Sequence, residues 1–368
     1  MALNVRALAR KISDGKAGRW ASHLLWSRDP MGATFRSREP AEIWRAPGAR
    51  SPSKGSDTLR VMTWNVKFGG GRIDFFFDGH GDRVRMNEAE VLGNLEQLAA
   101  MIRRVDPDVV MLQEVDRGSD RVAGVDQLAY LARASGLGFA AYGSQWRARF
   151  IPSDGVGRVD SGNAILSRYP LVLAERVALP LIQDQSGVVQ YFYLKRCLLR
   201  ARLAIPGRRG FWALCTHLSA FGGGEVKRAQ LDAVLRECAR IRSGGEGLVL
   251  GADLNALPPG SARWAGFPDV ASEDTDFDAG DFRGQEDLLV PAYEALHPVV
   301  GLEEYARDNA PFQTHSSSGR HFYNRKIDYL FSDSPWLEGG TLQGRGEGEV
   351  ETMSLSDHAP IVGVRGST

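Results

Sequence analysis

Two stretches of this chain repeat one plan, in which an apolar strand precedes an amphipathic helix and a second, buried strand. In chain order the segments are 59–66, 88–105 and 107–116, then 210–218, 225–241 and 247–255. Buried strands that are flanked by amphipathic helices must be covered on both faces. The repeated plan therefore predicts an α/β fold in which two sheets pack face to face with helices on the outside.

Both helical segments carry the signals of scaffold helices. In the first, apolar residues recur at the spacing of one helical face from Val91 to Ile102. Asn87 followed by Glu90 resembles a capping box, and Pro107 lies beyond the far end. Further strands are predicted at 162–180, 188–205, 325–332 and 359–365.

A run rich in Pro, Gly and Ser, at 46–56, separates a basic N-terminal segment from the first strong strand. We therefore expect a basic extension and linker over residues 1–57 and one catalytic domain over 58–368. Residues 1–60 hold 12 Lys and Arg against 5 Asp and Glu, and the remainder holds 33 against 40. Such an extension fits contact with nucleic acid, anionic lipid or the acidic body, and equally a solvated tail.

Several protein classes are disfavoured by composition. The apolar runs are far shorter than the roughly 18 to 20 residues that span a bilayer, so no transmembrane helix is expected. Basic residues between Arg6 and Arg28 interrupt any apolar region of a secretory signal. The cysteines, Cys197, Cys215 and Cys238, are odd in number and widely spaced, which fits neither a disulfide framework nor a CxxC metal site. We expect a cytoplasmic protein.

Polar residues with catalytic chemistry stand at the ends of the apolar strands. They are Asn65, Glu114, His217, Asp253, Asp328, Asp357 and His358. Any one alone is an ordinary strand terminus, but together they indicate a shared rim of carboxylates, amides and imidazoles. A site rich in oxygen ligands suits Mg²⁺, or Mn²⁺ in its place, rather than zinc. Phosphoric ester hydrolysis fits this set, because its transition state needs positive charge at the phosphoryl oxygens and an activated water in line.

Spacing indicates how these residues cooperate. Asp253 and Asn255 are two apart, so on a strand their side chains point to the same face. Adjacent residues on an extended chain point apart, which makes Asp357 a metal or water ligand rather than the partner of His358. The more distant Asp328 is the better candidate to orient that imidazole.

Seven segments resemble, in order, the motifs of the endonuclease/exonuclease/phosphatase (deoxyribonuclease I-like) superfamily. They are TWNV, LQEVD, GNAILSRYP, CTHLS, GADLN, KIDYLF and LSDHAPI, and they cover roughly residues 58–366. The resemblance implies a four-layer α/β/β/α sandwich of two mixed sheets with helices on the outer faces. It also implies a metal-dependent phosphodiesterase or phosphatase site at one end of the two sheets.

The same resemblance implies roles for the metal side of the site. Glu114 would hold the catalytic Mg²⁺, with Asn65 close by and Asp357 near the metal. Asp253 and Asn255 would orient the water and the phosphoryl oxygens.

On the substrate side, the resemblance implies that His217 contacts the phosphate. His358 paired with Asp328 would be the general base or the stabiliser of the transition state. Asn163, in the GNAILSRYP motif, would lie at the substrate mouth.

Two departures from the family's motifs bear on the substrate. The chain reads GADLNALPPG and NRKIDYLF where inositol polyphosphate 5-phosphatases carry their signatures, which disfavours a phosphoinositide phosphatase. The segment 256–260, ALPPG, replaces the acidic helix-forming run of abasic-site endonucleases, which disfavours abasic-site repair.

Three segments outside the motifs are candidate specificity elements. The insertion 69–85 carries Phe76 and His80 and is either a packed aromatic plug or a platform for a base or an acyl chain. The aromatic run 191–193 before Arg196 combines aromatic surface with phosphate contact, or belongs to the core. A small cationic patch at 315–325 suits a second phosphate. The candidate substrate contacts are thus Asn163, Phe76, His80, Arg196 and His321, with His315, Arg320 and Arg325 beside His321 in the patch.

The sequence predicts a Mg²⁺-dependent hydrolase of phosphoric ester bonds, a phosphodiesterase or nuclease that acts on nucleic acid or nucleotide by in-line attack of activated water. A sphingomyelinase-like phospholipid phosphodiesterase is the alternative. The body lacks the basic footprint of a protein that binds long duplexes, and the aromatic loop would serve a single-stranded end or a lipid. An inactive phosphate-binding module is disfavoured, because such a module has no need of a general base.

Overall fold

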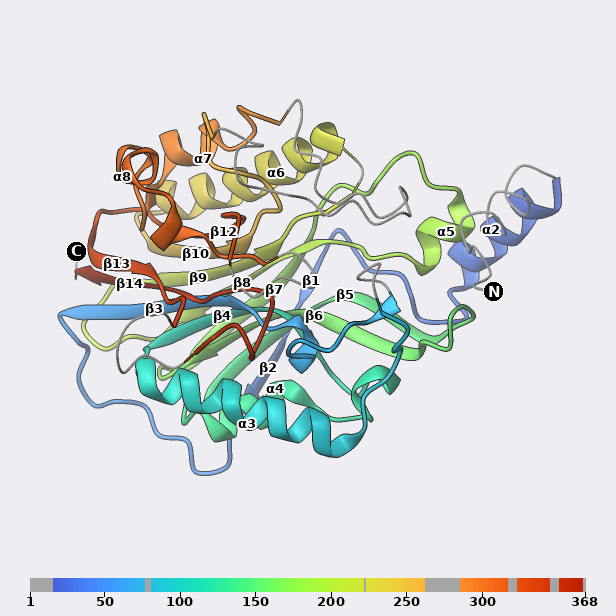
Figure 1. Cartoon of the computed structure of the whole chain (residues 1–368), viewed down its shortest axis with the longest axis horizontal. Helices are drawn as coiled ribbons and strands as arrows, with labels where there is room; N and C mark the ends of the chain where they lie inside the picture. The colour runs from blue at the N-terminus through green and yellow to red at the C-terminus, as the bar shows by residue number, and fades with distance from the viewer. Residues whose placement is uncertain are drawn as a thin grey trace.

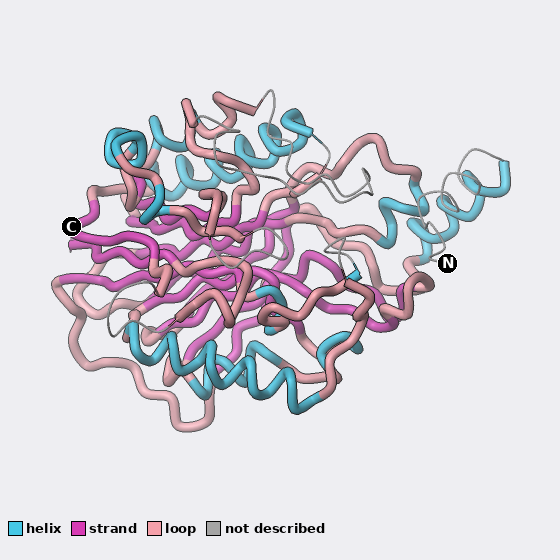
Figure 2. The backbone as a smooth tube through the Cα atoms, in the orientation of Figure 1, coloured by secondary structure: helices cyan, strands magenta, loops and turns pink. Residues whose placement is uncertain are grey.

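The computed structural model of the chain describes residues 16–76, 81–221, 223–261, 285–316, 323–344 and 351–366. These residues form two seven-stranded sheets of mixed strand direction. Figure 1 shows the sheets packed face to face between two layers of helices, and Figure 2 shows the same layers by type of structure. The predicted four-layer α/β/β/α sandwich is confirmed.

Two strand pairs run parallel, one in each sheet, and the other neighbouring strands pair antiparallel. Sheet A contains, in spatial order, β1 (Arg38–Pro40), β7 (Leu171–Ala178), β8 (Cys197–Leu203), β9 (Phe211–His217), β10 (Gly247–Asp253), β12 (Asp328–Ser332) and β11 (His297–Pro298). Sheet B contains β13 (Trp336–Thr341), β14 (Ile361–Gly366), β3 (Thr58–Asn65), β4 (Val109–Asp116), β6 (Gly157–Ser167), β5 (Phe139–Ile151) and β2 (Glu42–Arg45). The parallel pairs, β9 with β10 and β3 with β4, are the predicted strand–helix–strand units.

Helices cover the outer face of each sheet. The helices on sheet B are α3 (Glu88–Val105) and α4 (Gln127–Ala134), and those on sheet A are α6 (Gly223–Ser243) and α7 (Val290–Ala295). The others are α2 (Lys16–Arg28), α5 (Gly187–Phe192), α8 (Leu302–Arg307) and the 3₁₀ turns η1 (Lys67–Gly69), η3 (Asp120–Val122) and η5 (Ala310–Phe312). Among the described residues, none of the helices combines the length and the apolar character needed to cross a membrane.

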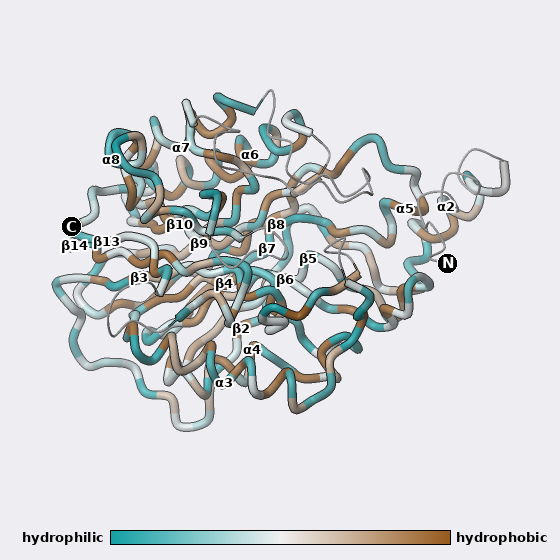
Figure 3. The backbone as a smooth tube through the Cα atoms, in the orientation of Figure 1, coloured by the Kyte–Doolittle hydropathy of each residue, from teal (hydrophilic) through white to brown (hydrophobic). Residues whose placement is uncertain are grey.

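The predicted capping box of α3 is present. The side chain of Asn87 accepts from the backbone N–H of Glu90, and the Glu90 carboxylate accepts from the backbone N–H of Asn87. Leu95 and Leu98 on its inner face are fully buried against sheet B. Figure 3 shows the alternation of polar and apolar positions along this helix, as expected where one face is buried.

The two sheets approach each other closely at Gly251 of β10. A Cβ at this position would lie 2.6 Å from Cε of Met111 and 2.7 Å from Cβ of Thr63, both on sheet B. Only glycine therefore lets β10 lie this near to β3 and β4. The close approach brings the ends of these strands together, two residues further along β10.

Two strands of the sandwich lie before residue 57, inside the predicted extension. Residues 38–40 form β1, which pairs with β7 of sheet A, and residues 42–45 form β2, which pairs with β5 of sheet B. One short segment of the supposed extension thus supplies an edge strand to each sheet. Strands of three and four residues are too short for periodicity to identify, and only their pairing partners define them.

The predicted strand over 188–205 is partly wrong. Its first residues form the short helix α5, and the strand begins at Cys197. Tyr191 of α5 is fully buried, and its hydroxyl donates to Asp29 at 2.7 Å. The indole of Trp26 in α2 packs edge-on against Tyr191 and donates to the carbonyl of Gly187 at 2.8 Å. The aromatic residues of this segment therefore anchor the N-terminal region on the sandwich.

A buried ion pair fixes the loop that follows β3. Arg121 contacts Asp116 of β4 through two hydrogen bonds of 2.7 and 2.9 Å, and its guanidinium lies 3.9 Å from the ring centre of Phe68 in η1. Asp116 has no exposed surface. The pair thereby ties the end of β4 to the turn after β3.

We expect Asp116→Asn to destabilise the protein by about 3–5 kcal/mol, because it leaves the buried guanidinium without its counter-charge. Urea unfolding monitored by circular dichroism measures the change. Glu96→Gln, which removes one partner of an exposed ion pair with Arg103, is the control and should leave stability nearly unchanged. Equal unfolding curves for Asp116→Asn and the wild type would contradict this account.

Candidate active site

The predicted rim residues meet at one edge of the sandwich because of strand direction. Asn65 ends β3 and His217 ends β9, while Asp253 ends β10. Asp328 begins β12, which runs antiparallel to β10, and it pairs directly with Asp253. His358 lies three residues before β14, which runs antiparallel to β3. Ends of parallel strands and starts of antiparallel ones share one edge, so all of these side chains converge.

Asn65 links the two sheets. Its amide Nδ2 donates to Oε1 of Glu114 at 3.1 Å and to Oδ2 of Asp253 at 3.0 Å, and its Oδ1 accepts from the backbone N–H of Lys67 at 3.0 Å. Asn65 itself is buried. One amide therefore holds a carboxylate from each sheet at a fixed separation.

Glu114 reaches the rim through a β-bulge. The pairing of β4 with β6 shifts register between Leu112 and Val115, and Glu114 has a φ of 59°. Gln113 is fully buried and donates to the hydroxyl of Thr63, whereas 30% of the Glu114 side chain is exposed. Bulges re-aim side chains near active sites, and here the bulge turns Glu114 out toward the rim.

The predicted pairing of His358 with Asp328 is present. Nδ1 of His358 donates to Oδ2 of Asp328 at 2.8 Å, and both residues are buried. This contact leaves Nε2 facing the rim, 3.9 Å from Oδ2 of Asp253 and 4.0 Å from Oδ1 of Asp357. Burial alone would lower the pKa of His358, but the charge of Asp328, its hydrogen bond and the other two carboxylates raise the pKa to about 10. The imidazole is therefore held as a cation among acids.

Asp253 lies at the centre of the rim. Burial, together with the negative charge of Asp328, raises the pKa of Asp253 to about 7, although His358 and the hydrogen bond from Asn65 act in the opposite direction. Such a carboxylate exchanges protons near neutral pH.

The spacing predicted that Asn255 lies on the same strand as Asp253, but the structure places it beyond the strand. The strand β10 ends at Asp253, and Asn255 follows in the left-handed region with a φ of 47°. Its backbone N–H donates to Oδ1 of Asp253 at 3.1 Å, an arrangement that asparagine tolerates well. The buried ammonium group of Lys227 donates to the carbonyl of Asn255 at 2.7 Å. A turn, not a strand face, brings the amide to the rim.

His217 is a neutral imidazole in this setting. Burial and the nearby positive charges of Arg196 and His358 hold the pKa of His217 well below its usual value. Nδ2 of Asn255 donates to Nε2 of His217 at 3.1 Å, which puts the single ring proton on Nδ1. Nδ1 lies 3.8 Å from Glu114 and has no hydrogen-bond partner among the described residues.

Asp357 lies near enough to Glu114 for its negative charge to act on that carboxylate. Burial and the charge of Asp357 together raise the pKa of Glu114. Burial would also raise the pKa of Asp357, but the ammonium group of Lys67, 3.8 Å from Oδ2, and the charge of His358 lower it. The two carboxylates, next to Asn65, offer oxygen ligands of the kind that a hard divalent cation prefers.

Arg196, a predicted substrate contact, lies beside this set just before β8. Burial lowers the pKa of Arg196, whereas the carboxylates of Glu114 and Asp253 raise it. The positive charge of Arg196 in turn lowers the pKa of His217. The side chain is half-buried, and its guanidinium has no hydrogen-bond partner among the described residues. A partly desolvated guanidinium of this kind is ready to bind an anion.

Other predicted substrate contacts lie elsewhere. The placement of Asn163 at the substrate mouth is wrong, because the residue has no exposed surface and lies between the sheets. Its amide donates to the carbonyl of Cys197 at 3.0 Å and accepts from Gln145 at 2.6 Å. His80 and His321 fall outside the described residues.

In the insertion that carries Phe76, both described phenylalanines pack against other apolar side chains. Phe75 is fully buried against Phe68, as expected of a plug. Phe76 is half-buried and packs on a cluster that includes Trp146 and Phe192. An aromatic surface therefore adjoins α5 and the N-terminal segment.

His315 belongs to the predicted cationic patch, of which Arg320 and His321 fall outside the described residues. Arg325 is buried, and burial, with nearby positive charges, holds the pKa of His315 well below its usual value. Its ring lies against that of His358, with 4.6 Å between the ring centres. The only sequence signal was its position close before the KIDYLF motif.

Comparison with known families places the protein among the phosphoric ester hydrolases. The chain belongs to the Endonuclease/Exonuclease/phosphatase family, which matches residues 62–358. No curated protein sequence matches it. The match spans every rim residue described above.

Solved structures with the same fold agree with this assignment. An endonuclease/exonuclease/phosphatase from Beutenbergia cavernae DSM 12333 is 24% identical, with 84% of this chain and 71% of that chain covered and a TM-score of 0.55. TDP2 from D. rerio, complexed with a single-strand DNA product, is 15% identical over 84% and 99% of the two chains, with a TM-score of 0.51. The human Nocturnin catalytic domain, with bound sulfate, is 16% identical over 89% and 98%, with a TM-score of 0.50. At these identities the likeness shows the fold.

Proposed function

We propose that the protein is a metal-dependent phosphodiesterase or nuclease that cleaves nucleic acid or nucleotide by in-line attack of activated water. The observation that carries the proposal is the convergence, at one sheet edge, of three carboxylates, a carboxylate-bound imidazolium and the guanidinium of Arg196. Phosphoryl transfer needs each of these: a cation site, a proton acceptor and positive charge around the phosphoryl group.

Glu114 and Asp357 are the residues that would hold Mg²⁺, with Asn65 close by and hydrogen-bonded to the Glu114 carboxylate. The raised pKa of Glu114, which follows from burial and the charge of Asp357, supports this choice, because a cation between the two carboxylates would relieve their repulsion. When bound, Mg²⁺ supplies positive charge to the phosphoryl oxygens, and Mn²⁺ has the same ligand preference.

The remaining rim residues handle the water and the phosphoryl group. Asp253 orients the attacking water and accepts its proton, since its pKa of about 7 is matched to neutral pH. The imidazolium of His358, held by Asp328, stabilises the charge that develops on the phosphoryl oxygens. Asn255 and His217 offer further polar contacts on the β9–β10 side.

Nucleic acid or nucleotide is the favoured substrate class because Arg196 offers charge for a phosphate, and Phe76 and Phe192 are partly buried aromatic side chains that pack on one apolar cluster. Bases stack on aromatic side chains without a requirement for a particular sequence. The likeness to TDP2 from D. rerio, complexed with a single-strand DNA product, supports the same class.

A phospholipid remains the second candidate because of one observation on α2. Trp20 is 69% exposed, and Arg19, His23 and Arg28 are exposed around it. An exposed indole among basic residues suits the surface of an anionic membrane.

The deciding experiment measures product formation from single-stranded DNA, RNA, a nucleotide diester and sphingomyelin vesicles, each with Mg²⁺ and with a chelator. His358→Ala serves as the blank. We expect the oligonucleotides to be cleaved, with activity lost on chelation and in the variant. Cleavage of sphingomyelin alone would favour the lipid branch, and no cleavage of any substrate would favour an inactive phosphate-binding module.

Arg196→Gln tests the phosphate contact. A charge-assisted hydrogen bond is worth about 1.5–3 kcal/mol, so we expect kcat/KM to fall by roughly 10- to 150-fold. Steady-state kinetics on the cleaved substrate measure this. Arg60→Gln is the control, because Arg60 is exposed at the opposite end of β3. An unchanged kcat/KM for Arg196→Gln would exclude this contact.

A further inference from the structure

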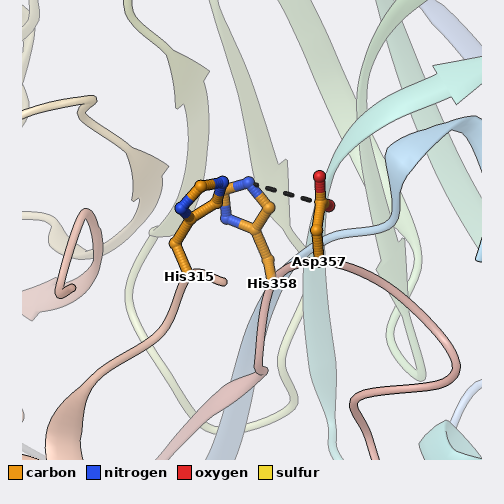
Figure 4. Close-up of side chains that lie close together, drawn as sticks. All are labelled: His315, Asp357 and His358. Atoms are coloured by element: carbon orange, nitrogen blue, oxygen red, sulfur yellow. Dashed lines mark ion pairs between the residues drawn. The ribbon is translucent and has the colours of Figure 1, made fainter. Parts of the chain in front are cut away.

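A second group of metal-binding side chains lies next to the hard-cation site. His315, Asp357 and His358 each offer one ligand atom, and these atoms all lie within 4.8 Å of one another. Figure 4 shows the two imidazole rings together, with the carboxylate of Asp357 facing His358. Neither the family motifs nor the proposed reaction requires His315.

The backbone holds this group in place. The backbone N–H of Ser316 donates to the carbonyl of Asp357 at 2.8 Å, and the N–H of Ala359 donates to the carbonyl of Thr314 at 2.6 Å. These hydrogen bonds pair His315 directly with His358 as an isolated antiparallel bridge. The segments around residues 315 and 358 are therefore fixed to each other, and little rearrangement is needed to bring the two rings to one ion.

The ring atoms are oriented for metal binding. Asp328 accepts the Nδ1 proton of His358, and a metal ion that binds Nε2 displaces the second ring proton of the imidazolium. A carboxylate on the far side of a ligating imidazole is the usual support of histidine–metal bonds. Nδ1 of His315 is buried and has no hydrogen-bond partner among the described residues. Nε2 of His358 lies 4.0 Å from Oδ1 of Asp357.

The donor set selects the metal. Zn²⁺ binds imidazole nitrogen at about 2.0–2.1 Å and carboxylate oxygen at about 2.0–2.2 Å, so tetrahedral ligand atoms lie about 3.4 Å apart. The atoms of this group need to approach by at most about 1.4 Å to reach that spacing. Two nitrogens and one oxygen suit Zn²⁺ and Co²⁺, whereas Mg²⁺ prefers oxygen ligands.

We infer that His315, Asp357 and His358 form a site for Zn²⁺. This site adjoins the proposed Mg²⁺ site at Glu114, and Asp357 belongs to both. Zn²⁺ bound there occupies Nε2 of His358 and one oxygen of Asp357. It therefore inhibits hydrolysis, a consequence that rests on the proposed function, whereas the binding itself does not.

Binding is tested first, on the whole, metal-free protein without substrate. Isothermal titration with Zn²⁺ and the visible absorption of added Co²⁺ are measured for the wild type, His315→Asn and His315→Gln. His297→Asn is the matched control, because His297 is exposed on β11. We expect a tetrahedral Co²⁺ spectrum and one Zn²⁺ site in the wild type and the control. Zn²⁺ affinity should fall at least about tenfold in both His315 variants, which lose one of three ligands.

Thermal unfolding without metal identifies any variant that fails to fold, and the other His315 variant then decides. Equal Zn²⁺ affinity in the wild type and a folded His315 variant would overturn the site. Inhibition is tested separately, by adding Zn²⁺ to Mg²⁺-activated enzyme. The Zn²⁺ concentration that halves activity is measured for each variant relative to that variant's own uninhibited activity. We expect that concentration to rise in the His315 variants. Zn²⁺ binding without inhibition would overturn the regulatory part, and absence of any hydrolysis would count against the proposed function but leave the binding result intact.

Discussion

His358→Ala is expected to lower turnover by about a hundredfold or more, the range for loss of acid–base or electrostatic catalysis. The imidazole links Asp328 to the centre of the rim, through Nδ1 on one side and Nε2, 3.9 Å from Asp253, on the other. Its removal takes away the positive charge that faces the phosphoryl group. Turnover of the cleaved substrate at saturating Mg²⁺ measures the effect.

Two further variants separate catalysis from folding. The backbone carbonyl of His358 accepts from the indole of Trp64 at 2.8 Å, and alanine keeps this contact. Asp328→Asn keeps the size of the carboxylate but lowers its ability to orient the ring, and it should also reduce turnover. Because the two residues act as one unit, the double variant should lose little more than His358→Ala alone. Full activity of folded His358→Ala would refute its role, and His297→Ala serves as the control for a histidine outside the site.

Glu114→Gln is expected to lower activity by on the order of a thousandfold, because a metal ion contributes several kcal/mol of charge stabilisation to the transition state. Glutamine keeps the hydrogen bond from Asn65 but loses the charge that would hold a divalent cation against Asp357. Activity as a function of Mg²⁺ concentration, and Mg²⁺ binding by calorimetry, measure the effect. Glu88→Gln, on the exposed side of α3, is the control.

The same variant has an expected effect on stability that distinguishes loss of metal binding from loss of fold. Burial and the charge of Asp357 raise the pKa of Glu114. At a pH above the usual pKa of glutamate, the ionised Glu114 side chain therefore destabilises the folded protein. Removing the charge should therefore leave the melting temperature in chelator equal to or above that of the wild type. A lower melting temperature in chelator, or Mg²⁺ activation equal to that of the wild type, would contradict the assignment of Glu114.

The sequence predicted which residues meet at the rim, because this prediction needs only the positions at which the apolar strands end. Asn65 and His217 end apolar strands that begin the two strand–helix–strand units, and Asp253 ends the second returning strand. Parallel strands in one sheet end at the same edge. The alternation of side chains on an extended chain disfavoured Asp357 as the partner of His358 and left the more distant Asp328 as the better candidate, and these two residues are hydrogen-bonded.

Features that depend on contacts between distant strands were not predictable in the same way. Asn163 sits in a motif typical of the family, yet it is buried because the sheets close over it. The short edge strands β1 and β2 exist only because β7 and β5 offer unpaired edges. His315 reaches His358 through a backbone bridge between separate loops.

By itself, the sequence determined the two strand–helix–strand units, the sandwich implied by the family motifs and the identity of most rim residues. Only the tertiary structure decided how those side chains are aimed. The bulge at Glu114, the left-handed turn at Asn255 and the close approach at Gly251 set those directions. The physical reason is that periodicity records which face of an element is buried, whereas a bulge or turn is stabilised by its partners across the sheets and has no periodic signal of its own.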